Sequence, residues 1–209
     1  MQKIAAGCIG IFLIIFVLVI VTAIGSYNGL IGASTAVDGK WADVQAQYQR
    51  RSDLIPNLVS TVQGAANFEK STLIAVTDAR ASVGQVKIDQ HQAPTDQATL
   101  NQYQAAQAQV GSALSRLLVV AENYPNLKSS ENFIGLQTQL EGTENRIAVS
   151  RKDFNDAVQT YNTKIKSFPI VLIAATMGFQ PKAYFQADQG AQNAPKVNFD
   201  FSGSTAPAH

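Results

Sequence analysis

The side chains that carry most enzyme chemistry are scarce in this sequence. The chain has two histidines, His91 and His209, and a single cysteine, Cys8. A di-metal site in a helical bundle uses a glutamate followed three residues later by a histidine, whereas Glu141 and Glu144 have that spacing with no histidine near them. We therefore expect no catalytic residue, no metal site and no cofactor, and we expect a protein that is not an enzyme and has no small-molecule substrate.

Positive charge is also too sparse for a nucleic-acid-binding surface. The chain has 16 Lys and Arg against 15 Asp and Glu, for a net charge of +1. The two signs are interspersed, and the sequence has no basic cluster with interleaved aromatic residues of the kind that contacts phosphates and bases. Nucleic acid is therefore excluded as an expected partner.

One charged residue interrupts an apolar helical stripe. From Val37 to Val62, apolar side chains recur at alternating spacings of four and three, and Arg51 takes one of these positions. If this helix packs antiparallel against the last one, Arg51 lies opposite a polar stretch that contains Glu144. A buried arginine without an acceptor is costly, so we expect an Arg51–Glu144 pair that fixes the helix register. The alternative is that Arg51 reaches the surface along a buried aliphatic stem.

Asparagine and glutamate gather near the expected helix ends. In an up-and-down bundle, the end of the first helix, the start of the second, the end of the third and the start of the fourth meet at one tip. Six residues fall at this tip: Asn57, Glu69, Glu122, Asn123, Glu131 and Asn132. They either dock a partner or cap the helix termini.

The N-terminus has the composition of a membrane anchor. No charged residue lies between Ile4 and Ile24, and a helix of this length spans roughly 32 Å, which matches a bilayer core. The apolar core of a signal peptide is only about 7–15 residues long, so we expect an uncleaved transmembrane helix (4–24) after a short flank (1–3). Lys3 before the helix, with no basic residue after it until Lys40, favours a cytoplasmic N-terminus and an external domain. The inverted topology is the alternative.

Four amphipathic segments follow a juxtamembrane linker (25–34). Short connections cannot return a chain along a long helix, so neighbouring helices must pack antiparallel. The fold class is therefore all-α, with an N-terminal transmembrane helix followed by an elongated antiparallel up-down four-helix bundle (35–168). A three-helix coiled coil with the second and third helices fused is the alternative, and Pro94 argues against it. Side chains placed to start helices are Thr35, Thr95 or Asp96, and Ser129 or Ser130.

An apolar segment (169–185) follows the bundle and is too short to span a membrane. The topology returns it to the membrane-proximal end, where it either enters the bilayer interface or folds back as a lid on the bundle core. The residues that would lie in the interface are Phe168, Phe179, Lys182, Tyr184 and Phe185. The tail (186–209) is expected to be disordered, although Val197–Phe201 alternates in a way that suits strand addition to a partner.

Several short strings in the sequence are specific. These are Arg50–Val59, Arg116–Pro125, Glu131–Phe133, Glu144–Ile147, Tyr161–Lys164 and Met177–Phe179. Through them the chain resembles the LemA family of bacterial membrane proteins, from the anchor to about Phe199. The resemblance implies a single-pass protein of the bacterial inner membrane with an antiparallel helical bundle and no enzymatic activity. One member of that family takes part in magnetosome-membrane formation, which suggests a membrane-organising role.

Two functions remain open from the sequence. The first is a non-enzymatic scaffold, a bundle held at the membrane that recruits an unidentified membrane or envelope protein and associates as a homo-oligomer. The second is a membrane-shaping protein that oligomerises and inserts its segment 168–185 into the bilayer interface. Both have the lipid bilayer as a partner.

Overall fold

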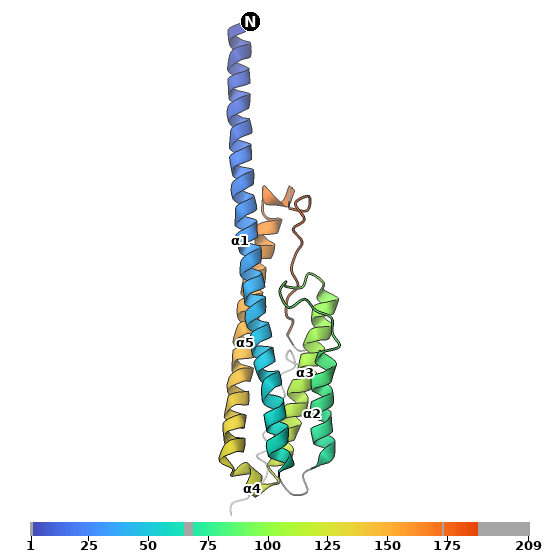
Figure 1. Ribbon diagram of the computed structural model, residues 1–209. Helices are drawn as coiled ribbons and strands as arrows, with labels where there is room; N and C mark the ends of the chain where they lie inside the picture. Colours follow the sequence, from blue (N-terminus) through green and yellow to red (C-terminus); the bar gives the residue numbers. More distant parts are fainter. Residues whose placement is uncertain (1, 65–68, 173, 188–209) are drawn as a thin grey trace, which may run out of the picture.

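The computed structural model describes residues 2–64, 69–172 and 174–187, and over these residues the chain is helical with no strand (Figure 1). The all-α prediction is confirmed. The elements, in chain order, are α1 (Gln2–Gln63), α2 (Lys70–Val83), α3 (Gln97–Ala121), α4 (Pro125–Lys128), α5 (Glu131–Lys166) and a 3-10 turn, η1 (Ile170–Leu172).

Helix α1 is one continuous helix of 62 residues, roughly 93 Å long at the usual rise per residue. Its N-terminal part stands clear of the other helices, and its C-terminal part belongs to the bundle (Figure 1). The expectation that a helix begins at Thr35 is wrong, because residues 25–34 are helical and the Thr35 hydroxyl donates to the Ile31 carbonyl at 3.0 Å. This stretch holds no proline to stop a helix, and the burial of Leu30 and Val37 stabilises it.

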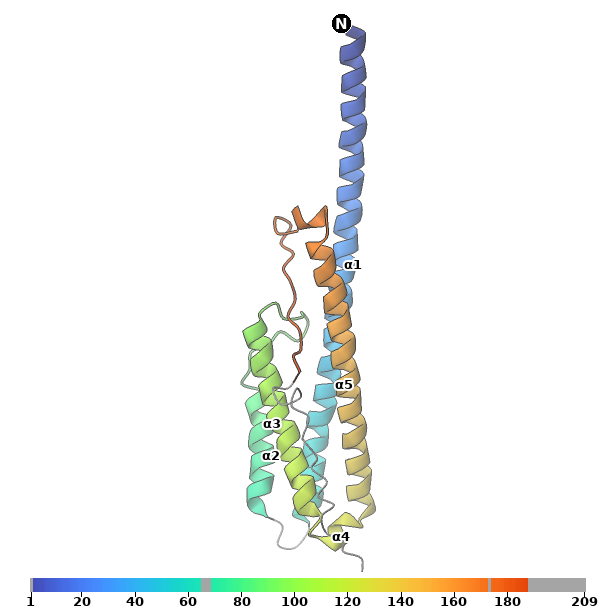
Figure 2. The ribbon, with the colours of Figure 1, turned by 180° about the vertical axis from the view of Figure 1, so that it is seen from behind.

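The remaining helices form the expected up-and-down arrangement. Helix α5 runs antiparallel beside α1, α2 and α3 form a second antiparallel pair, and the short α4 lies in the link between α3 and α5 (Figures 1 and 2). Asp96 accepts hydrogen bonds from the backbone of Ala98 and Thr99 and caps α3, and Ser130 accepts from Phe133 and caps α5. Both predicted N-caps are therefore confirmed.

The core divides into two apolar clusters along the bundle. The membrane-proximal cluster is centred on Trp41, whose ring packs against Phe154 at 5.5 Å between centroids, and the distal cluster is centred on Leu58 and Leu117. Three of the buried polar side chains are found between the clusters, namely Arg51, Gln107 and Thr143. This polar layer lies where the sequence shows a break in the apolar stripes of three helices.

After α5 the chain turns near the anchor and runs back along the bundle. Residues 180–187 descend in extended form between the α1/α5 pair and the α2/α3 pair (Figure 2). We call these residues the strap, and we call the turn that precedes it (167–172 and 174–179) the membrane-proximal loop. The two helix pairs are consequently bridged in the upper half of the bundle by an extended segment.

Candidate functional site

Arg51 connects three helices from inside the bundle. Its side chain is 5% exposed, and Nη1 donates to Glu144 Oε1 on α5 at 2.9 Å. Its Nη2 donates to the backbone carbonyl of Gln107 on α3 at 3.0 Å and to the Gln107 side-chain oxygen at 2.5 Å. The guanidinium also lies over the ring of Tyr48, 5.3 Å from its centroid. The charge is therefore fully engaged within the fold, which suits a role in helix register.

Burial around Arg51 also changes the chemistry of its aromatic neighbours. Desolvation raises the pKa of Tyr48 to about 12. Desolvation likewise raises the pKa of Tyr103, whose hydroxyl donates to Gln45 Oε1 at 2.9 Å. Both phenols stay protonated at neutral pH, so neither acts as a base there. The two phenols therefore act as packing and hydrogen-bonding groups in the polar layer.

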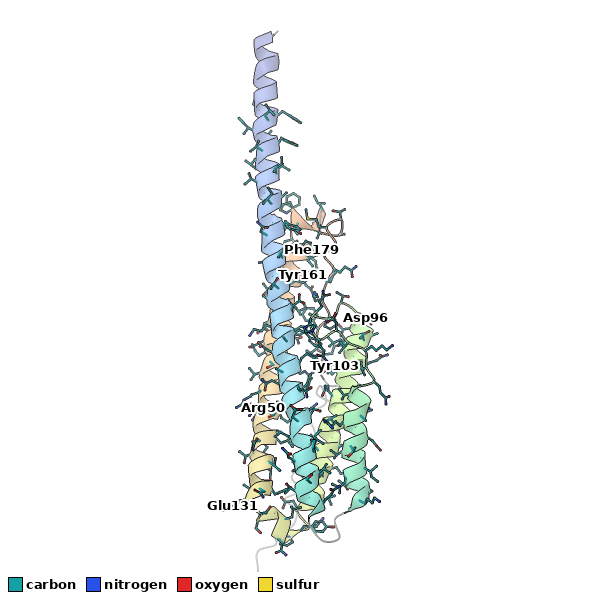
Figure 3. The ribbon with its side chains drawn as sticks, in the orientation of Figure 1. Arg50, Asp96, Tyr103, Glu131, Tyr161 and Phe179 are labelled. Carbon is teal, nitrogen blue, oxygen red and sulfur yellow. The ribbon has the colours of Figure 1, made fainter. Side chains whose placement is uncertain are left out.

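The six tip residues do gather at one end of the molecule. They lie at the ends of α1, α2, α3 and α5, away from the anchor, and Figure 3 shows Glu131 at this end. All six are exposed. A cavity of about 560 Å³ opens beside two of them, Asn123 and Asn132, and Tyr124 and Leu127 also line it. The tip thus combines exposed amide and carboxylate groups with a partly apolar hollow.

Helix capping explains little of this cluster. The cap of α5 is Ser130, and Glu69 stands at the N-cap position of α2 without a side-chain cap bond. The Glu69 carboxylate instead accepts a local hydrogen bond from Ser71, and the Glu122 carboxylate pairs with Lys128. The four other side chains make no hydrogen bond to another residue that the structure describes: Asn57, Asn123, Glu131 and Asn132. Their polar groups face solvent and are open to a partner.

The membrane-proximal loop exposes apolar side chains at the other end. It contains no charged residue. The exposed fraction is 80% for Phe168, 69% for Leu172, 48% for Val171 and 40% for Met177. Phe179 packs edge-on against Tyr27 at 5.8 Å between ring centroids, three residues beyond the expected end of the anchor (Figure 3). Gly178 closes the turn with φ of 81°, a conformation that L side chains rarely adopt.

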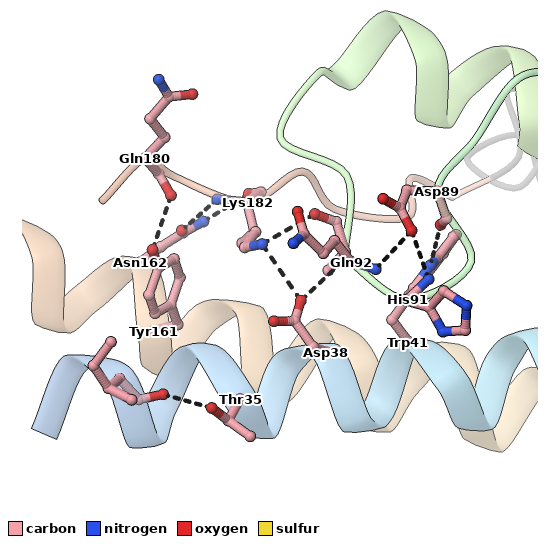
Figure 4. A network of polar contacts seen from close by, with 12 residues as sticks. Thr35, Asp38, Trp41, Asp89, His91, Gln92, Tyr161, Asn162, Gln180 and Lys182 are labelled. Atoms are coloured by element: carbon pink, nitrogen blue, oxygen red, sulfur yellow. Dashed lines mark hydrogen bonds and ion pairs between the residues drawn. The ribbon is translucent and has the colours of Figure 1, made fainter. Parts of the chain in front are cut away.

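Three of the residues expected at the bilayer interface belong to the bundle instead. Phe185 is 5% exposed and packs between Trp41 and Phe154, so its assignment to the interface is wrong. The side chain of Lys182 is 10% exposed and its ammonium contacts Asp38 Oδ1 at 3.4 Å, which removes it from the interface too (Figure 4). Tyr184 is half-buried and its backbone is bonded to Gln97 on α3. The lid alternative describes this part of the segment, because burial of Phe185 and Ala183 completes the core.

The N-terminal part of α1 is the one described helix that is long and apolar enough to cross a membrane. The best window has a mean hydropathy of 2.6, and none of it is buried inside the protein. The large apolar side chains from Ile11 to Val21 are all exposed. Such a surface is stable only in an apolar surrounding.

Residues 40–199 match the model of the LemA family. The chain belongs to the LemA family. This match covers most of the bundle and the strap, so the expected resemblance is confirmed.

Named relatives of this LemA family member include magnetosome proteins. The chain is 27% identical over 208 residues to magnetosome protein MamQ 2 of Paramagnetospirillum magneticum, with 88% of this chain and 75% of the relative covered. It is similarly 27% identical over 210 residues to magnetosome protein MamQ of Magnetospirillum gryphiswaldense. Protein LemA of Metamycoplasma hominis is 24% identical over 181 residues, with 87% of this chain and 75% of the relative covered. Family and relatives indicate a membrane-associated protein, and none of these names describes an enzyme.

No group of three or more His, Cys, Asp or Glu side chains is close enough to hold a metal ion within the described part of this LemA protein. The residues that sequence reasoning missed are four amides that bind the strap, Gln97, Gln104, Asn155 and Asn162. Asn162 directly follows the buried Tyr161 within the specific string Tyr161–Lys164, and this position was the signal in the sequence. The tail (186–209) was expected to be disordered, but Gln186 is bonded to Gln104 on α3; residues 188–209, including Val197–Phe201, lie outside the described residues.

Proposed function

We propose that this LemA family member is a non-enzymatic, membrane-anchored scaffold that presents a partner-docking tip. Residue 57 lies 33 residues beyond Ile24 along α1, so the tip stands roughly 50 Å from the bilayer. The protein sits in the bacterial inner membrane with a cytoplasmic N-terminus and works as a homo-oligomer. Its partner is an unidentified membrane or envelope protein.

One observation carries this proposal. Exposed Asn and Glu side chains from four separate helix ends lie at the end of the bundle away from the anchor, and four of the six make no side-chain hydrogen bond to another described residue. Solvated amides and carboxylates beside Tyr124 and Leu127 form the mixed polar and apolar surface that protein partners use. A rigid bundle is well suited to hold such a surface at a fixed distance from the membrane.

Paired variants separate docking from stability. Replacing Glu122 and Asn132 by alanine should change the free energy of unfolding by no more than about 0.5 kcal/mol, because Glu122 occupies the C-cap position of α3 through its backbone alone and Asn132 lies in the first turn of α5, whose cap is Ser130. The same double variant should lose partner cross-links in native membranes, measured by mass spectrometry. Asp96→Ala is the matched control: it removes the side-chain cap bonds at the other end of α3, away from the tip, should cost about 1 kcal/mol, and should keep the cross-links. Cross-links that survive in the double variant would reject the docking tip.

A second function, membrane shaping, is favoured by the membrane-proximal loop. Four exposed apolar side chains sit next to the anchor, with Lys164 and Lys166 at the end of α5 placed to meet anionic headgroups. The inserting part is then the loop, without the buried Lys182 and Phe185. Shallow insertion by many side-by-side copies would wedge one leaflet apart and curve the membrane.

Depth-dependent quenching tests this insertion in proteoliposomes. A fluorophore on Leu172→Cys, in a Cys8→Ser background, should be quenched by nitroxide groups on lipid chains. The same fluorophore on Val119→Cys, which is 68% exposed on α3 and remote from the anchor, should not be quenched. Equally weak quenching at both positions would show that the membrane-proximal loop does not insert, and would reject the membrane-shaping function.

A further inference from the structure

The strap is held as a peptide is held by a receptor. Its backbone is bonded by side-chain amides, each of which both donates to a carbonyl and accepts from the N–H of one strap residue. Asn162 pairs in this way with Lys182 at 2.9 and 2.9 Å, and Asn155 pairs with Phe185 at 2.9 and 3.0 Å. On the opposite wall, Gln97 pairs with Tyr184 at 2.8 and 3.1 Å and Gln104 pairs with Gln186 at 2.8 and 3.3 Å. Helices α3 and α5 thus form the two walls of a groove that binds an extended backbone through side-chain amides.

The side chains of the strap also enter defined subsites. The Lys182 ammonium contacts Asp38 Oδ1 at 3.4 Å and donates to the Ala93 carbonyl at 3.1 Å (Figure 4). Ala183 is 4% exposed and donates its N–H to the Pro94 carbonyl at 2.9 Å. The ring of Phe185 packs on Trp41 and Phe154, and the Arg151 guanidinium lies 4.8 Å from its centroid. The groove therefore favours a lysine at position 182, a small residue at 183 and an aromatic residue at 185, and it sets no preference at 184.

These contacts come from the groove and do not depend on which chain supplies the strap. The strap contributes no helix or sheet of its own, so any copy of the segment that reaches the groove makes the same bonds. The link from α5 to Lys182 is residues 167–181, which reach up to about 50 Å when extended. Anchors in one bilayer hold neighbouring bundles parallel with their grooves at the same height.

We propose that this groove is a peptide-binding site that accepts residues 180–187 from a second copy of the chain, so that neighbouring copies exchange straps. Exchange replaces the contacts within one chain by identical contacts between chains, which makes it a low-cost route to association. The membrane-proximal loop is the hinge that opens. This inference is independent of the distal tip and gives the homo-oligomer a defined contact.

Thiol cross-linking between two tagged copies tests the exchange. Both copies are full-length and carry Cys8→Ser; one carries Arg151→Cys on the groove wall and the other carries Gln186→Cys on the strap. Arg151 Nη2 donates to the Gln186 carbonyl at 3.3 Å, so a short bis-maleimide links the two positions when a strap fills the groove. We expect a shift from monomer to a dimer that bears both tags in co-expressing membranes.

Three controls decide the outcome. A single copy with both cysteines should link internally, and failure to do so would overturn the groove itself. Lys152→Cys in place of Arg151→Cys tests random collision, because its side chain is 73% exposed on the same helix, and an equal dimer yield there would overturn the proposal. Adding Phe185→Asp to the Gln186→Cys copy should remove the dimer, since it abolishes the aromatic anchor. Internal linking without any two-tag dimer would show that the strap stays with its own chain.

Discussion

At the scale of single residues, the two apolar clusters meet at one buried guanidinium. Arg51 replaces an apolar side chain on the α1 stripe, and Gln107 and Thr143 are the buried polar residues at its level on α3 and α5. Register slippage of one helix by a turn would place this charge against an apolar neighbour. The polar layer therefore opposes misaligned packing of the helices.

Replacing Arg51 by methionine should lower the free energy of unfolding by about 1–3 kcal/mol, because the Gln107 carbonyl and amide lose their donor inside the bundle. Glu144→Gln should cost less than about 1 kcal/mol, since the Glu144 side chain is 43% exposed and water can replace its partner. Denaturant unfolding checks both. Arg50→Met is the control, as Arg50 is exposed next in sequence. A larger loss for Glu144→Gln than for Arg51→Met would contradict this assignment.

Tyr48 should make the bundle sensitive to alkaline pH. Burial raises its folded-state pKa to about 12, against an ordinary value of 10.0 in the unfolded chain. The stabilising effect is complete below pH 10 and is lost as pH rises toward 12, a change of roughly 2–3 kcal/mol. Tyr48→Phe cannot ionise and should flatten that part of the stability curve. Identical slopes for the two proteins between pH 10 and 12 would show that Tyr48 ionises as readily when folded.

At the scale of elements, caps and apolar stripes place the helices, while the strap joins them. Asp96 and Ser130 start α3 and α5. Thr35 does not begin a helix, because a residue that could cap a helix lies inside one when packing favours an unbroken helix. The α1/α5 and α2/α3 pairs then owe part of their cohesion to residues 182–186.

The α3 stripe is open to a direct test. Leu117 is fully buried in the distal cluster, so Leu117→Asp should unfold the domain, because an unpaired buried charge costs several kcal/mol, on the order of total stability. Val119→Asp, two residues along the same helix and 68% exposed, should leave thermal melting nearly unchanged. Circular dichroism melts of the two variants give the comparison. Similar melting for both would contradict the assignment of the buried face.

At the scale of the whole molecule, α1 determines where the bundle stands, because its apolar N-terminal part and its bundle part form one helix. Because it runs unbroken from Gln2 to Gln63, the bundle cannot pivot freely about a flexible linker. The membrane-proximal loop is thereby held beside the bilayer and the tip is held away from it. A stiff connection of this kind suits a protein whose partners lie at a set height.

Membrane orientation can be measured on the full chain. A reporter that is active only outside the cytoplasm, fused after Pro207, should be active, because the basic residues near the anchor favour a cytoplasmic N-terminus. A matched reporter that works only in the cytoplasm should stay silent at the same position. The opposite pair of signals would place the bundle and its tip in the cytoplasm.

Local pattern and loop length were enough to predict the apolar N-terminal helix, the helices of the bundle and their antiparallel order. Apolar periodicity marks the buried face of each helix, and short links leave only one way to pack neighbours. Counting along the antiparallel α1 and α5 also placed Arg51 opposite Glu144, and the structure has their side chains 2.9 Å apart. These inferences concern residues whose partners are set by helix geometry.

Only the tertiary structure decided where residues 180–187 go. Their composition suits a membrane interface as well as a lid, since Lys182 and Phe185 fit either surrounding. The choice depends on four amides on α3 and α5 that are 20 to 87 residues away in sequence. No periodic pattern in the strap encodes those partners, because an extended backbone presents the same N–H and C=O groups whatever its sequence. The groove exists only after α3 and α5 have packed around α1, so its occupant follows from the assembled bundle.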